Sequence, residues 1–70
     1  MNENEVVKAY EAGEIINVQV YDYDLDGNIV DAGSDSITYR EVTGDVERNG
    51  ASYFVNLIIS GGDIVSAKAR

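Results

Sequence analysis

The amino-acid sequence predicts a mainly β fold: a small antiparallel sheet or barrel of about five strands joined by hairpins, with at most one short N-terminal helix. Valine and isoleucine make up about half of the hydrophobic residues, and their branched side chains suit a pleated, half-buried surface better than a helix. Glycine-containing pairs also divide the chain into segments of strand length. The alternative is an α+β fold in which the helix packs on the sheet.

The N-terminal segment fits two structures. Asn2, followed three residues later by Glu5, has the form of a capping box, and Gly13 is suited to end a helix over Glu3–Ala12. Two adjacent valines weaken such a helix, and residues 11–13 also fit a three-residue hairpin loop. The segment is therefore either a helix or a further strand.

Turn signals define the remaining elements. Asp26-Gly27 and Asn49-Gly50 are typical of two-residue hairpins, because both positions of a type I′ turn need a positive φ angle. Gly61-Gly62 marks a third reversal, and Gly44-Asp45 marks a turn or a bulge within a longer strand. These breaks predict an antiparallel meander with strands near Glu14–Leu25, Asn28–Asp31, Ser36–Thr43, Ala51–Ser60 and Asp63–Ala69.

The fourth of these segments is apolar on both faces. Tyr53, Val55 and Leu57 alternate on one side, while Phe54 and Ile58 lie on the other. A strand of this kind belongs at the centre of a sheet, with a helix, a second layer or a partner subunit over the second face. A homodimer is therefore one of the alternatives.

The first segment changes the face that carries its apolar side chains. Up to Val20 the even-numbered residues are apolar, whereas after Val20 the odd-numbered ones are. A β-bulge near Val20 reconciles the two halves, because one extra residue redirects all later side chains. We therefore expect a row of three carboxylates on the outer face of this strand, formed by Asp22, Asp24 and Asp26.

Composition restricts the function. The chain has 70 residues and a formal net charge of -8, which predicts a single small acidic domain. Cysteine and histidine are absent, so disulfides, thiolate metal sites and histidine-based catalysis are excluded, and we expect neither enzyme activity nor a cofactor. With no long apolar segment and no export signal, we expect a cytoplasmic protein without a membrane partner. Its acidity argues against direct binding to nucleic acid.

Negative charge is concentrated in one part of the chain. From Ala9 to Tyr39 there are seven acidic residues and no basic one. Such a segment can act as a nucleic-acid decoy, with carboxylates in the place of phosphates in the basic groove of a nucleic-acid-binding protein. Neighbouring tyrosines would add anchoring contacts. The predicted partner-binding residues are Asp22, Asp24, Asp26, Asp31, Asp35, Tyr21, Tyr23 and Tyr39.

In size, acidity and lack of cysteine the chain is similar to phage-encoded inhibitors of host defence, such as anti-CRISPR and anti-restriction proteins. The similarity lies in this overall profile and involves no motif. It implies an inhibitor that acts in the cytoplasm of a bacterial host cell.

Two other interpretations stay open. The acids of a small β domain can serve solubility alone, in which case the chain is a structural or assembly module that self-associates through its sheet. Asp22, Asp24 and Asp26 also resemble the opening of an EF-hand calcium loop, followed by Gly27 at its sixth position. The twelfth position, which should be Glu, is Gly33, so only a weak calcium site is expected.

Overall fold

A capping box starts a helix at the N-terminus, as the first of the two interpretations predicts. In the computed structural model, α1 spans Glu3–Glu11. The Asn2 side chain accepts a hydrogen bond from the Glu5 backbone N–H at 2.9 Å, and the Glu5 carboxylate accepts one from the Asn2 backbone N–H at 3.0 Å. Both N–H groups would otherwise lack a partner within the helix.

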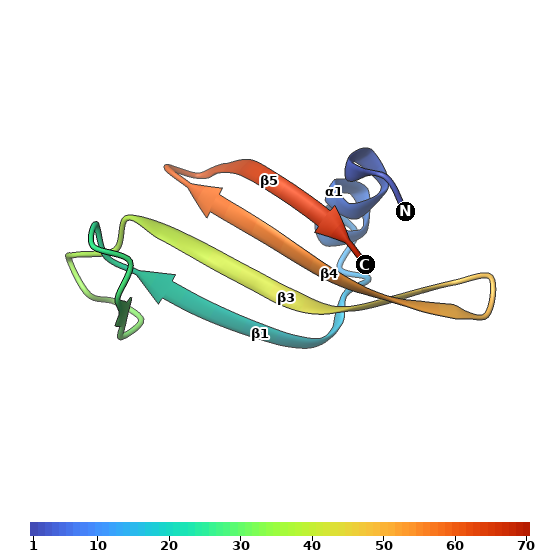
Figure 1. The fold of residues 1–70 in the computed structure, drawn as a ribbon, viewed down its shortest axis with the longest axis horizontal. Coiled ribbons are helices and arrows are strands. Elements are labelled where there is room, and N and C mark those ends of the chain that lie inside the picture. Colours follow the sequence, from blue (N-terminus) through green and yellow to red (C-terminus); the bar gives the residue numbers. More distant parts are fainter.

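Five antiparallel strands form one open sheet against which α1 packs, so the predicted mainly β fold is confirmed (Figure 1). The structure describes residues 1–70. Across the sheet the order is β2-β1-β3-β4-β5, and β2 and β5 are the edges of a sheet that does not close into a barrel. No helix is long and apolar enough to cross a membrane. The strands are Ile16–Tyr23 (β1), Ile29–Val30 (β2), Tyr39–Arg48 (β3), Ala51–Ser60 (β4) and Asp63–Ala69 (β5).

The predicted meander is wrong in one respect, because β3 pairs with β1 and not with β2. The chain returns past β1 through residues 31–38. β2 has only two residues to pair, whereas β3 pairs along most of β1. The two residues of β2 offer too few backbone hydrogen bonds to pair with a strand as long as β3. The long strands β1 and β3 therefore pair directly with each other. As a result, the outer edge of β1 has no partner strand from Ile16 to Tyr21.

The turns confirm two of the predicted hairpins and change the third. Asn49 and Gly50 join β3 to β4 with φ angles of 52° and 80°, as a type I′ turn requires. Two adjacent glycines with positive φ join β4 to β5 in the same way. Between β1 and β2 only Gly27 has a positive φ. The Asp26-Gly27 pair therefore belongs to a longer loop. A hydrogen bond from the backbone N–H of Asp24 to the backbone carbonyl of Asn28 closes this loop.

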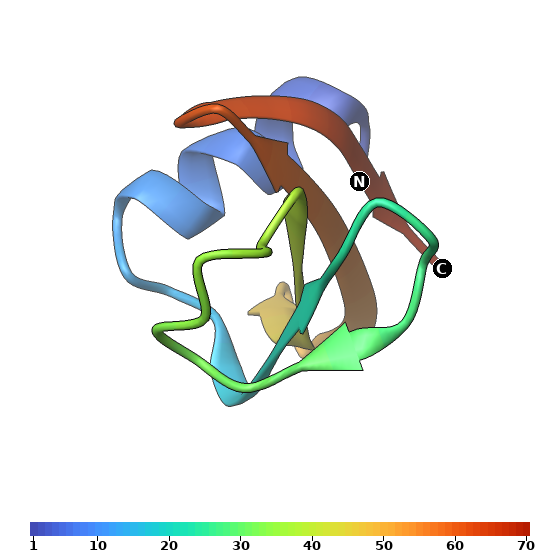
Figure 2. The same cartoon turned by 90° about the vertical axis from the view of Figure 1, so that its left-hand side faces the viewer.

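The core lies between α1 and one face of the sheet. Val6 and Ala9, three residues apart and therefore on the same side of α1, are fully buried. The strand register places Val42 beside Leu57, and Leu57 beside Ala67. These apolar side chains, with those of Val46 and Val55, form the core. We call this the covered face of the sheet and the opposite one the open face, because α1 lies on only one side (Figure 2).

The bulge in β1 lies earlier than predicted. The register of β1 with β3 shifts between Ile16 and Gln19, where Asn17 has a φ angle of 52°. A bulge near Val20 is therefore wrong, and the pairing is regular from Gln19 onward. Because side chains alternate along a regular strand, the odd-numbered residues of β1 after the bulge all point to the open face.

β3 continues through Gly44 to Arg48, and so does not end at Thr43 as predicted. Gly44 is buried beside the start of β1, where residues 15, 16 and 18 lie close to its backbone. A Cβ atom at this position would lie 2.7 Å from the Ile16 carbonyl oxygen and would overlap the Ile15 side chain. Glycine is thus required inside this strand by the close approach of another segment of backbone.

Replacing Gly44 with alanine is expected to lower the free energy of unfolding by about 1–3 kcal/mol, because the added methyl group overpacks this close approach. Urea unfolding followed by circular dichroism measures this loss. The loss should be smaller in an Ile15→Ala background, where the overlapping side chain is truncated. Equal losses in the two backgrounds would contradict the contact between residues 44 and 15.

Candidate functional site

Asp22, the first residue of the predicted acidic row, is buried in an ion pair. Its relative exposure is 4%, and it lies directly across from Arg40 in the β1–β3 ladder. Arg40 donates from Nε to Oδ1 at 2.7 Å and from Nη2 to Oδ2 at 3.2 Å, which is the two-pronged geometry of strong arginine–carboxylate pairs. These hydrogen bonds lower the pKa of Asp22 below its ordinary value, although burial acts in the opposite direction.

The expected orientation of Asp22 on an outer face with Asp24 and Asp26 is therefore wrong. Asp22 lies two residues after Val20, which pairs with Val42, so by alternation it points to the covered face, the side to which Val42 also points. The carboxylate of Asp22 is already neutralised by Arg40 and cannot contact a partner without breaking that pair.

Asp24 is also engaged within the chain. Its Oδ1 accepts hydrogen bonds from the backbone N–H groups of Asp26 at 3.0 Å and Asn28 at 2.9 Å. The side chain thus organises the loop between β1 and β2, as aspartate does in many turns. The structure has no group of three or more acidic side chains arranged to hold a metal ion, so Asp22, Asp24 and Asp26 do not form the ligand cluster that the calcium alternative needs.

Three of the predicted acids have side chains with no partner in the structure. Asp26, Asp31 and Asp35 are exposed and take part in neither of the two ion pairs. All three lie in the loops that follow β1 and precede β3, and these loops gather at one end of a molecule measuring 40 × 20 × 19 Å (Figure 1). We call these three residues the acidic loop end.

The predicted tyrosines come together on the open face. The rings of Tyr23 and Tyr39 stack with their centroids 4.8 Å apart and their planes within 13°. The Tyr23 hydroxyl donates to Glu41 at 2.9 Å, and this hydrogen bond, reinforced by burial, raises the pKa of Tyr23. Tyr21 lies one position further along the same face, where its hydroxyl donates to Gln19. Stacking and hydrogen bonds therefore hold two of these rings against the sheet.

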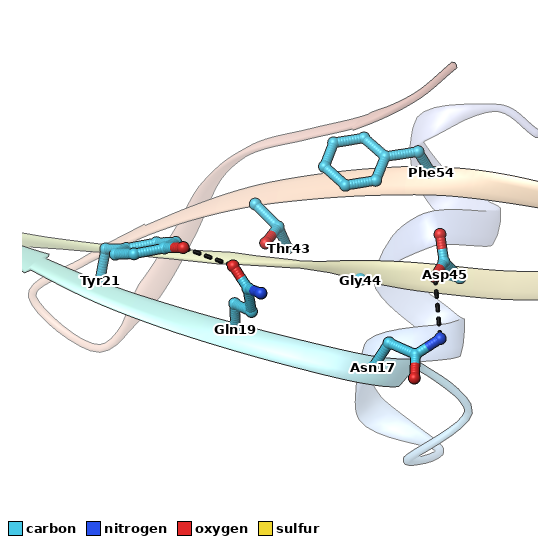
Figure 3. A pocket seen from close by; sticks show the side chains of 7 residues that line it. All are labelled: Asn17, Gln19, Tyr21, Thr43, Gly44, Asp45 and Phe54. Atoms are coloured by element: carbon cyan, nitrogen blue, oxygen red, sulfur yellow. Dashed lines mark hydrogen bonds between the residues drawn. The ribbon is translucent and has the colours of Figure 1, made fainter.

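A groove on the open face involves residues that the sequence reading did not select (Figure 3). Its volume is about 400 Å³. Tyr21 lies at one end, Phe54 and Asp45 lie at the other, and Gln19 and Thr43 lie between them. Asn17 and Gly44 complete the lining.

A turn or a bulge at Gly44-Asp45, as predicted, gives no reason to expect Thr43 and Asp45 on the same face of one strand. Once β3 continues through this dipeptide, alternation places Thr43 and Asp45 on the open face. The register then sets Thr43 beside Gln19, and Asp45 beside Phe54. Two carboxylates, several amides and hydroxyls, and aromatic rings share this face, a combination that can bind cationic groups and hydrogen-bond donors.

Comparison with known protein families, with curated proteins and with solved structures gives no match to this chain.

The Asp22–Arg40 pair predicts a specific loss of stability in acid. The folded-state pKa of Asp22 lies below its ordinary value of 3.8. The pair therefore stabilises fully above that pH, and the contribution is lost as the pH falls through the folded-state pKa. The difference in unfolding free energy between wild type and Asp22→Asn should be constant from about pH 7 to 5 and shrink below about pH 4.

Urea unfolding at each pH tests this expectation. Asp63→Asn removes the same charge from the exposed start of β5 and is the control for net charge. A difference between wild type and Asp22→Asn that persists unchanged to about pH 2 would show that ionisation of Asp22 does not stabilise the fold.

Proposed function

We propose that this chain is a non-catalytic inhibitor that binds another protein, presenting its acidic loop end to a basic, nucleic-acid-binding surface. The observation that carries the proposal is the state of Asp26, Asp31 and Asp35: these exposed carboxylates have no ion-pair partner within the chain and lie at one end of it. Arg40, at the start of β3, is the basic residue that follows these loops, and it is already paired with Asp22.

Uncompensated charge of one sign is unfavourable for an isolated domain, because like charges repel. The same charge gives a basic partner a strong attraction at a distance and accelerates association. Carboxylates also accept two hydrogen bonds from one arginine, as phosphate groups do. The stacked rings of Tyr23 and Tyr39 on the adjoining open face offer rigid aromatic contacts beside these charges.

A protein bound in this way excludes nucleic acid from the partner's groove by direct competition. Phage-encoded inhibitors of host defence, which the chain resembles in size and charge, are the class in which this action is most useful. The proposed site of action is then the cytoplasm of a bacterial host cell.

Replacing Asp26, Asp31 and Asp35 together with asparagine is expected to weaken binding of the partner by about tenfold or more, because the charge that steers and anchors it is removed. The test is affinity capture from nuclease-treated bacterial lysate, with elution by rising salt. The wild-type chain should retain a basic nucleic-acid-binding protein that moderate salt or added duplex DNA releases.

A triple variant at other exposed acids, Glu3→Gln, Glu11→Gln and Asp63→Asn, changes the net charge equally and is the matched control. It should capture the same protein as the wild type. Equal loss in both variants would show that only total charge matters, and capture that DNA cannot compete away would contradict the decoy mechanism.

The outer edge of β1 supports a second candidate, the self-associating module. Val18 and Val20 are about half exposed, at 50% and 49%, on a strand whose outer edge lacks a partner from Ile16 to Tyr21. Residues 15–21 contain no charged side chain, so no charge on this edge opposes pairing with a second copy. Two β1 strands related by a two-fold axis would pair antiparallel, each giving the same residues to the contact.

If β1 forms such a pair, Val18→Lys should convert a dimer into a monomer, since each copy would bring a charged lysine into the paired edge. Sedimentation at high protein concentration, with and without 1 M salt, measures the state; a β-paired dimer should resist salt. Val65→Lys, at an exposed valine on the β5 edge, is the control. A wild-type chain that stays monomeric at high concentration would exclude this candidate.

A further inference from the structure

We propose that the groove between Tyr21 and Phe54 binds an arginine side chain of the basic partner. The inference rests on the proposed function, but it concerns a different set of residues. The groove is on the open face of the sheet, while the acidic loop end lies in the loops beyond β1 and β2. A partner that contacts both would be held at two separate places.

The first support is an acidic group without a counterion. Asp45 accepts one hydrogen bond at Oδ2, from the side-chain amide of Asn17 at 3.1 Å. No lysine or arginine pairs with it, since the two ion pairs of the structure are Arg40–Asp22 and Arg48–Glu14. In Figure 3 the other oxygen of Asp45 points away from Asn17, toward the strand that carries Phe54. This oxygen is available to a donor that enters the groove.

The second support is the pair of aromatic rings. Phe54 is directly across from Asp45 in the β3–β4 ladder, and its exposure of 44% is large for a phenylalanine. Tyr21 lies at the other end of the groove (Figure 3). The faces of such rings attract cations, and this attraction adds to that of the carboxylate.

Guanidinium fits this arrangement better than the alternatives. It is planar, it stacks on aromatic rings, and it carries five N–H donors in a fixed plane. The free Asp45 oxygen and the Thr43 hydroxyl are acceptors along the groove. A lysine ammonium would gain the charge contact with less stacking. A neutral sugar would use the amides and hydroxyls, but it would leave the charge of Asp45 uncompensated.

The experiment is a titration of the ¹⁵N-labelled full-length chain, followed by amide chemical shifts, with two peptides of equal charge: four Arg-Gly repeats and four Lys-Gly repeats. The arginine peptide should cause saturable shifts at Gln19, Thr43, Gly44 and Asp45, and should bind about two- to fivefold more tightly there than the lysine peptide.

Asp45→Asn should weaken binding at the groove by about fivefold or more, since it removes the charge but keeps an acceptor for Asn17. Asp63→Asn, an exposed acid outside the groove, should leave it unchanged. Phe54→Leu keeps an apolar side chain and should reduce the preference for arginine over lysine. The dispersion of the amide spectrum verifies that each variant is folded.

The outcomes separate this inference from the proposed function. Shifts confined to residues 24–38 would overturn the groove while leaving the acidic loop end as a binding site. Equal affinities of the two peptides for the groove would also overturn the groove inference. So would groove shifts with maltose, a neutral sugar titrated in the same way, when the arginine peptide causes none. Arginine-specific shifts at the groove, with no partner captured by the acidic loop end, would support the groove and contradict the proposed decoy.

Discussion

The packing of one short helix on a long sheet is the constraint from which the other features follow. A helix of nine residues is about 13 Å long, whereas a strand of ten residues is about 33 Å long. Val6 and Ala9 can therefore bury only the part of the covered face that they reach, near Leu57 and Ala67. The far part of the sheet must be completed by other means, and that part carries the loops between β1 and β3.

Polar contacts complete this distant part of the sheet. Arg40 covers the buried Asp22 with its own side chain, which stays about half exposed. The Asp24 carboxylate accepts hydrogen bonds from backbone N–H groups of its own loop, which have no partner strand. On the open face Tyr23 binds Glu41, which also accepts from Asn56. Each of these acids contributes to structure, and those left over define the surface that is free to meet a partner.

Local chemistry determined how much of this could be predicted from the sequence. The capping box and the Asn49-Gly50 turn act within a few residues, and both were found at the expected positions. The pairing of β1 with β3 and the close approach at Gly44 depend on distant segments, so they left no local signal. The face of Asp22 was predicted wrongly because the apolar side of β1, which carries Tyr21 and Tyr23, was expected to face the core. The core lies instead on the opposite side, the side of Val42 and Asp22. The sequence selected the tyrosines and the loop acids as candidate residues, but it did not predict the groove, because the groove's walls come from three different strands.

The contact between α1 and β5 joins the first element of the chain to the last (Figure 1). Val6 leaves the ribosome long before Ala67, so its apolar side chain has no native partner during most of synthesis. The hairpins β3–β4 and β4–β5 pair neighbours in sequence and can form early, whereas closing the helix onto the sheet requires nearly the whole chain. The same contact places the beginning and the end of the domain side by side, where an engineered linker could join them and new ends could be opened at an exposed turn.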